Sequence, residues 1–170
     1  EVKRDSVDLK RFKIPGEQFV CERPLSILKK VQEALTAKVS LGARKRIPKL
    51  VGGVDVSYPT PGQGVAGYAL VELETGRLAW STTVRRAVDF PYISSYLAFR
   101  ELPILLDLLK EVAAAGKMTD LLLVDGSGIL HQRHAGLASH LGVTASVATI
   151  GVTKRLLSGV VDQENMEPEE

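Results

Sequence analysis

Three acidic residues occupy positions at which a strand or helix pattern favours apolar side chains. Asp55 interrupts the apolar run VGGVDV, and strand alternation places it on the face opposite its two valine neighbours. Asp125 ends the run LLLVD, at the carboxyl end of a strand, where α/β sheets place their ligands. Glu101 lies one helical turn from both Leu97 and Leu105, so it points inward if these leucines pack on the sheet.

The chemistry that these acids share is metal binding. Buried carboxylates that converge repel one another, so a cation is expected among them. Ligation by oxygen alone favours Mg²⁺ or Mn²⁺ over Zn²⁺. Each acid taken singly also fits a turn, a helix cap or a surface ion pair. Taken jointly, Asp55, Glu101 and Asp125 predict a site for Mg²⁺ (or Mn²⁺).

The segment DGSGILHQRHAGLASHLG, which begins at the second aspartate, is rich in glycine and histidine. Gly126 and Gly128 permit a close approach between backbone and ligand. His131 and Arg133 are near enough to Asp125 in sequence to serve as a hydrogen-bond donor beside the carboxylates and as a phosphate ligand. The remaining two histidines fit ordinary packing or surface positions, and the histidine spacing does not favour zinc.

Two further features are expected near this site. Lys154 follows the last predicted strand and so lies at the same edge of the sheet, although an ordinary surface lysine fits there equally well. The turn that begins at Pro91 carries Tyr92 and Ile93 just before the Glu101 helix. Such a turn can wedge into a base stack or can pack onto its helix as a hydrophobic staple, and the spacing alone leaves both interpretations open.

The elements that must position these residues indicate an α/β fold. A peripheral helix is predicted over 24–39, with an apolar stripe formed by Leu25, Leu28, Val31 and Leu35. The remainder predicts a three-stranded antiparallel meander followed by two parallel strands with helical crossovers, and the strand that starts at Leu121 is expected to be buried on both faces. The predicted ranges are strands 50–58, 64–73 and 77–85, helix 94–115, strand 121–125, helix 135–141 and strand 146–151.

Composition and charge are typical of a single domain of 170 residues, 45% of them hydrophobic. The net charge of +2 conceals a gradient, because residues 1–50 carry 13 Lys/Arg against 6 Asp/Glu, or +7, whereas the last ten residues carry five acids and no base. We therefore expect a basic helical segment packed on the core (1–49), a catalytic core (50–160) and an acidic disordered tail (161–170). One cysteine, a charged N-terminal sequence and no apolar run of about 20 residues favour a soluble cytoplasmic monomer that does not bind membranes.

Four ordered segments resemble the endonuclease V family: VGGVDVSY, PYISSYLAFRE, VDGSGILHQRHAGLASHLGV and TIGVTKRLL. The resemblance implies a ribonuclease H-like mixed sheet and hydrolysis of the second phosphodiester 3′ to inosine in DNA or RNA, which leaves 3′-hydroxyl and 5′-phosphate ends. It implies that Asp55, Glu101 and Asp125 bind Mg²⁺ or Mn²⁺, with His131 and Lys154 beside the scissile phosphate. It also implies a strand-separating wedge made by Pro91, Tyr92, Ile93 and Ser94 and a base pocket lined by Leu97, Gly126, Gly136 and Leu157.

The chain departs from the family pattern in two places. Ser95 stands where the wedge motif usually has glycine, and the sequence ends in VDQENMEPEE without the family's later Ser-x-Gly-His segment. Because of the second departure, two alternatives stay open beside a nuclease: an inosine-binding domain that cuts weakly or not at all, and a fragment that associates with a partner. The sequence does not distinguish DNA from RNA as the substrate.

Overall fold

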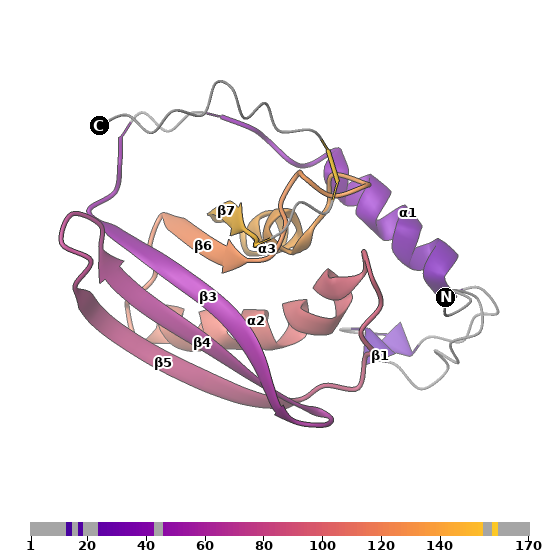
Figure 1. Cartoon of the computed structure of the whole chain (residues 1–170), viewed down its shortest axis with the longest axis horizontal. Helices are drawn as coiled ribbons and strands as arrows, with labels where there is room; N and C mark the ends of the chain where they lie inside the picture. Colours follow the sequence, from indigo (N-terminus) through magenta and orange to yellow (C-terminus); the bar gives the residue numbers. More distant parts are fainter. Residues whose placement is uncertain (1–12, 15–16, 19–23, 43–45, 155–157, 160–170) are drawn as a thin grey trace.

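A five-stranded mixed sheet in the order β5-β4-β3-β6-β7 forms the centre of the fold (Figure 1). The computed structural model describes residues 13–14, 17–18, 24–42, 46–154 and 158–159. The strands of the sheet are β3 (Leu50–Thr60), β4 (Gln63–Glu72), β5 (Leu78–Ala87), β6 (Leu121–Asp125) and β7 (Ala148–Val152). A separate antiparallel pair is formed by β1 (Lys13–Ile14) and β2 (Glu17–Gln18). The predicted α/β architecture with its mixed sheet is confirmed.

The direction of the strands follows from their connections. Two short turns join β3, β4 and β5, which therefore pair antiparallel. β6 lies parallel to β3 and β7 lies parallel to β6, because helices α2 (Leu97–Ala114) and α3 (Leu137–Ala145) provide the crossovers. The register pairs Val54 with Val124. Since Asp55 and Asp125 each follow these valines, they occupy neighbouring positions on two adjacent strands, at the carboxyl end of β6 and in the middle of β3.

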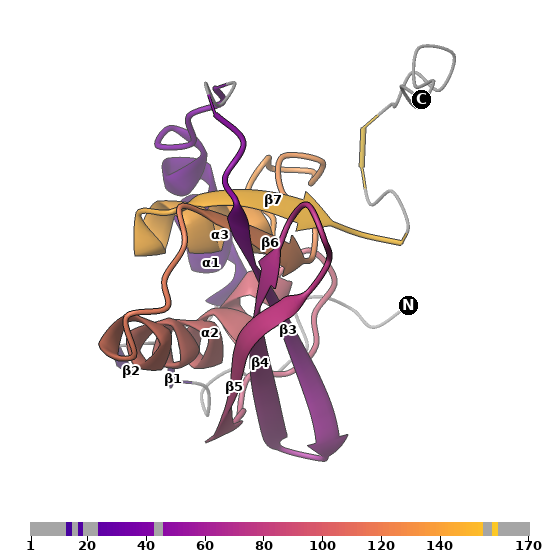
Figure 2. The same cartoon turned by 90° about the vertical axis from the view of Figure 1, so that its left-hand side faces the viewer.

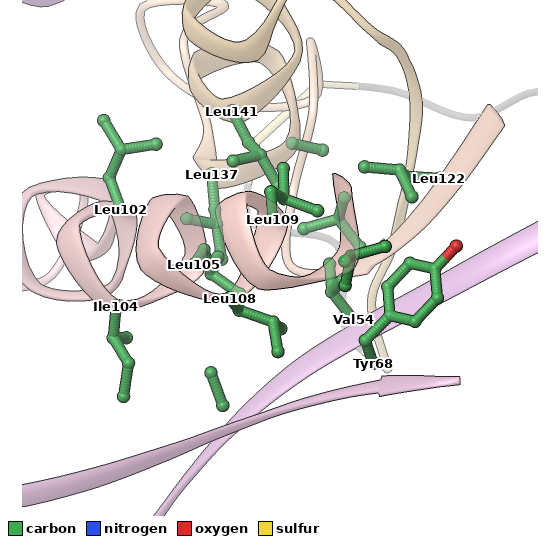
Figure 3. Packing of buried hydrophobic residues seen from close by; sticks show 14 of the residues in the cluster. Val54, Tyr68, Leu102, Ile104, Leu105, Leu108, Leu109, Leu122, Leu137 and Leu141 are labelled. Carbon is green, nitrogen blue, oxygen red and sulfur yellow. The ribbon is translucent and has the colours of Figure 1, made fainter. Parts of the chain in front are cut away.

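The hydrophobic core lies between the sheet and helices α2 and α3. Figure 2 shows the described helices gathered on one side of the sheet. Leu105 and Leu108 of α2 are fully buried, and Leu141 of α3 packs in the same cluster with Val54 and Leu122 of the sheet (Figure 3). Because this packing fixes α2 along its length, the helix holds Glu101 in one place relative to the ends of the strands.

Helix α1 (Pro24–Thr36) packs against α3 and lies on the right-hand side of the molecule in Figure 1. The predicted apolar stripe was correct at Leu25, Leu28 and Leu35 but wrong at Val31, which is 41% exposed. Gln32 takes its place in the contact and is only 1% exposed. The buried stripe of the helix therefore keeps its three leucines and has a polar side chain in place of the valine.

Several boundaries differ from those predicted. α2 begins at Leu97 rather than at residue 94, because Ser95 has a positive φ of 69° that no α-helix can include. α3 continues past Gly142 to Ala145 and ends where Ser146 adopts the left-handed conformation. β6 is not buried on both faces, since Leu123 is 36% exposed on the side away from α2.

Parts of the expected domain organisation fall outside the described residues. These are residues 1–12, 15–16 and 19–23 of the N-terminal segment, Arg44 and Lys45 of its basic run, and the acidic tail 161–170. Within the described ranges, no helix is both long enough and apolar enough to span a membrane.

Candidate functional site

Asp55, Glu101 and Asp125 line one cavity of about 380 Å³. They come from β3, α2 and β6, so three elements that are distant in sequence meet there. A larger hollow of about 1210 Å³ runs along β6 and β7 and contains none of the three acids. The chemistry of the lining side chains therefore identifies the smaller cavity as the candidate site.

Glu101 is the buried member of the three, with 7% of its surface exposed. The Tyr58 hydroxyl, which projects from β3, donates a hydrogen bond of 3.1 Å to its Oε1. Burial raises the pKa of Glu101 to about 7, the bond from Tyr58 opposes this rise, and the negative charges of Asp55 and Asp125 add to it. The carboxylates therefore act on one another across the cavity.

Asp55 and Asp125 are both exposed at the mouth of the cavity. The backbone N–H of Val56 donates to Oδ1 of Asp55 at 2.7 Å, which orients that carboxylate. Asp125 closes β6, and the backbone turns sharply at Gly126, where φ is +150°. A substrate approaching from solvent meets these two acids before it meets Glu101.

The donor set of the cavity fits a hard divalent cation by its chemistry. All three side chains offer only oxygen, and a bound cation relieves the repulsion from Asp55 and Asp125 that adds to the effect of burial on the pKa of Glu101. In the part of the chain that the structure describes, no three His, Cys, Asp or Glu side chains are gathered closely enough to hold an ion together. The carboxylates thus share a cavity without forming a closed ligand cluster.

His131 is buried and lines the cavity, but both of its ring nitrogens are occupied by the protein. Nε2 lies 3.0 Å from the carbonyl oxygen of Ser95, and the N–H of Arg133 donates to Nδ1 at 3.2 Å. Because a carbonyl only accepts, Nε2 carries the proton and the ring is neutral. Burial lowers the pKa of His131, in agreement with this assignment.

Two residues of the turn before α2 have different environments, which bear on the two interpretations of this turn, a wedge and a hydrophobic staple. Tyr92 is 71% exposed, whereas Ile93 packs against the cluster of Leu25, Leu28, Phe90, Tyr96 and Phe99. The N–H of Tyr96 donates to the Ile93 carbonyl at 2.9 Å and closes the turn. Ile93 is therefore the staple, and Tyr92 is the aromatic side chain presented to solvent at the rim, where it and Ser94 line the cavity.

The glycine-rich wall of the cavity depends on a close backbone contact. Leu97, Gly126 and Gly136 all line it. A Cβ at Gly136 would lie 2.1 Å from the carbonyl oxygen of Ser127, a distance that no real contact reaches. Only glycine fits there, because Ser127 occupies the position that a Cβ would take.

Two of the residues expected at the site do not line the cavity, and a third falls outside the part of the chain that the structure describes. Arg133 does not line the cavity, because its guanidinium contacts Gln32, Ser95 and the ring of Tyr96 instead of facing Asp125. Lys154 is exposed just after β7 and also lies outside the lining, although its neighbour Thr153 is part of it. Leu157 lies outside the described residues.

The structure adds residues that the motifs did not indicate. Tyr58 contacts Glu101, and Gln32 of α1 lines the cavity. A glutamine within an apolar helical stripe, four residues after Leu28 and three before Leu35, was the signal available for Gln32. No spacing signal connected Tyr58 to a helix 43 residues away.

Comparison with known proteins identifies relatives of this chain. A family profile described as Endonuclease V matches residues 33–170. Endonuclease V of Ignicoccus hospitalis is 48% identical over 109 residues, which cover 64% of this chain and 49% of that protein. The human Endonuclease V is 40% identical over 148 residues, which cover 80% of this chain and 52% of that protein.

Solved structures agree with these sequence matches. Ciona intestinalis Endonuclease V, crystallised in complex with a 24mer DNA containing an inosine followed by a ribo-adenosine, superposes with a TM-score of 0.74 at 32% identity, covering 79% of this chain and 59% of that one. The fold is thus ribonuclease H-like, as in endonuclease V structures. This chain spans about half the length of the curated relatives it matches. The profile match includes every element that carries Asp55, Glu101 and Asp125, and the chain accordingly belongs to the endonuclease V family.

Proposed function

We propose that this chain forms the core of a divalent-metal-dependent endonuclease that cleaves nucleic-acid strands containing inosine. The observation that carries the proposal is the shared cavity. Its walls combine three carboxylates with a glycine wall and a rim that bears an exposed tyrosine. Cleavage at a particular base needs both a pocket for the base and a metal site, because the base must leave the stack and a phosphodiester must then be hydrolysed beside it.

In this proposal Asp55, Glu101 and Asp125 hold Mg²⁺ or Mn²⁺. The ion supplies activation of water and stabilisation of charge on the leaving oxygen when it is bound. Asp55 and Asp125 at the mouth meet the cation first, and Glu101 completes the site from the buried side. Tyr58 keeps its proton, since burial raises its pKa, and so it remains a donor that orients Glu101.

The base pocket and wedge follow from the same geometry. Leu97, Gly126 and Gly136 form the wall against which the extruded hypoxanthine lies, and Tyr92 fills the space that it leaves in the stack. His131 holds the turn through the Ser95 carbonyl. Lys154, exposed beside the cavity residue Thr153, contacts a backbone phosphate at the mouth. Hydrolysis at the second phosphodiester 3′ to inosine is the expected outcome.

Gel electrophoresis of end-labelled strands tests the proposal. Matched DNA and RNA strands carry one inosine or one adenosine at the same position, and each is incubated with Mg²⁺, Mn²⁺ or EDTA. We expect metal-dependent nicking of the inosine strand only and its loss in Asp55→Ala. Nicking in EDTA, or full activity in that variant, contradicts the proposal. Selective retention of the inosine strand without product at saturating Mn²⁺ would show a binding domain instead.

A further inference from the structure

Gln32 is a buried polar side chain on a helix that the cleavage chemistry does not use. Its amide group is satisfied entirely by backbone and side-chain partners from two other segments. Nε2 donates to the carbonyl oxygens of Ser95 at 2.9 Å and Ala135 at 3.4 Å, while Oε1 accepts from Nε of Arg133 at 2.7 Å. Because both amide hydrogens are committed, Gln32 is not available to read a base, although it lines the cavity.

The Ser95 carbonyl is the point at which these contacts converge. It accepts from Gln32, from Nε2 of His131 at 3.0 Å and from Nη2 of Arg133 at 3.0 Å. Ser95 itself has a φ of 69°, a left-handed conformation that disfavours every residue with a Cβ except in special contexts. Three donors on one carbonyl compensate for that cost and hold the turn in a conformation that serine would otherwise leave.

Helix α1 also holds the loop that carries His131. The Thr36 hydroxyl donates to the carbonyl oxygen of Arg133 at 2.7 Å, and the Arg133 guanidinium lies 4.7 Å from the centre of the Tyr96 ring. The turn before α2 and the loop after β6 are thus both tied to α1. The chain leading into α2 passes close to that helix in Figure 1.

From this geometry we infer that Gln32 and Arg133 are positioning residues that lock the Tyr92 turn and the His131 loop in register with each other. The lock places the wedge and the glycine wall at a fixed separation. Its consequence for strand separation rests on the proposed function, whereas the lock itself does not. A helix that carries none of the three carboxylates therefore controls how well the cavity receives an extruded base.

Hydrogen exchange tests the lock without reference to catalysis. Gln32→Met keeps the length of the side chain and removes all three of its hydrogen bonds. We expect exchange at the amides of Tyr96 and His134, which close the turn and the loop, to accelerate by about tenfold or more, because local opening loses these contacts. The amides of β4 should keep their protection. Glu33→Gln, on the exposed face of the same helix, is the matched control and should change neither segment.

A variant of Arg133 provides a second test in case Gln32→Met does not fold. If Gln32→Met also lowers protection throughout β4, Arg133→Met becomes the test variant, because it removes the other side of the same contact. Where both variants fold, their effects on the Tyr96 amide should be clearly less than additive, since either one opens the lock. Unchanged exchange at Tyr96 and His134 in a folded Gln32→Met or Arg133→Met protein overturns the inference.

A cleavage readout then separates positioning from simple stability. In Gln32→Met, nicking of an inosine duplex should fall by about tenfold relative to nicking of the same inosine in a single strand, because only the duplex needs the wedge. An equal fall on both strands contradicts a role in strand separation. If the wild-type chain nicks neither strand, the proposed function fails while the exchange result still decides the lock.

Discussion

The hydroxyl of Tyr58 on β3 donates a hydrogen bond of 3.1 Å to Oε1 of Glu101 on α2. The guanidinium of Arg100 lies over the same ring, 4.1 Å from its centre, and donates to the carbonyl oxygen of Phe90. A carboxylate on a helix is thus oriented from the neighbouring strand. The sheet and the helix that supply the acids are coupled directly at the site.

Tyr58→Phe removes this hydrogen bond while it preserves the ring and its contact with Arg100. A hydrogen bond to a charged group contributes about 1.5–3 kcal/mol, so we expect the melting temperature to fall by several degrees and, because Glu101 loses its orientation, the nicking rate at saturating Mg²⁺ to fall by about tenfold or more. Thr75→Ala is the matched control, because it removes a hydroxyl-to-carboxylate bond of 3.0 Å to Glu72 on the exposed β4–β5 turn. Equal rates in Tyr58→Phe and wild type would show that Tyr58 does not orient Glu101.

Tyr92→Ala tests the wedge. Because the side chain is largely exposed, its loss should leave the melting temperature unchanged. Stacking of an aromatic side chain on a base is worth about 1–3 kcal/mol, which predicts affinity for an inosine duplex reduced by roughly 5- to 100-fold in a binding titration. Tyr92→Phe should retain most of the affinity. If Tyr92→Ala binds duplex and single strand as the wild type does, the tyrosine is an ordinary surface residue.

Gly136→Ala tests the glycine wall. A Cβ there meets the Ser127 backbone, which cannot move without displacing the segment after β6. Overpacking of this kind costs about 1–3 kcal/mol, so the free energy of unfolding in urea should fall by that amount, and inosine binding should fall with it. Gly42→Ala is the control, since its Cβ would have no neighbour within 4 Å. Identical unfolding curves for Gly136→Ala and Gly42→Ala would contradict the close contact.

His140 predicts a dependence of stability on pH. The ring is buried against Phe99 at 5.3 Å, its Nδ1 has no hydrogen-bond partner, and burial lowers its pKa to about 4. Between that value and the ordinary pKa of about 6.5, His140 is protonated in the unfolded chain but neutral in the folded chain. The free energy of unfolding is therefore highest above pH 6.5 and decreases as the pH falls toward 4.

The size of that loss is up to about 3 kcal/mol for His140 alone, by the linkage between pKa and stability. Urea unfolding at pH 7, 6, 5 and 4 measures it. His140→Leu, which has no titrating group, should show a shallower decline over the same range. Parallel curves for the two proteins would mean that the folded state accommodates the protonated ring.

The sequence predicts the fold well because the periodicity of each element is strong and the connections are short. The strand order around Asp55 and Asp125 follows from one meander and two helical crossovers. What could not be predicted are contacts between distant segments. Alternation places Asp55 on a face, but it says nothing of Tyr58 reaching Glu101 or of Gln32 reaching Ser95.

Backbone and side-chain conformations that depend on tertiary contacts could not be predicted from the sequence either. The left-handed Ser95 shortens α2 at its start, and it exists because three donors hold its carbonyl. Arg133 is close to Asp125 in sequence, but its side chain turns toward α1, because a tertiary contact with Gln32 holds it there. Nearness along the chain is a weak guide wherever a loop folds back between two helices.

In the proposed function, Asp55, Glu101 and Asp125 together hold the divalent cation with which the chain cuts beside inosine. The most direct measurement is the single-turnover nicking rate of an end-labelled inosine strand as a function of Mg²⁺ concentration, in wild type and in Asp125→Asn. We predict one product, cut at the second phosphodiester 3′ to inosine, a rate that saturates with Mg²⁺, and a loss of about 10²–10³-fold or more in a variant that melts at the wild-type temperature. The same rate in Asp125→Asn, or a rate that does not respond to Mg²⁺, would contradict the claim.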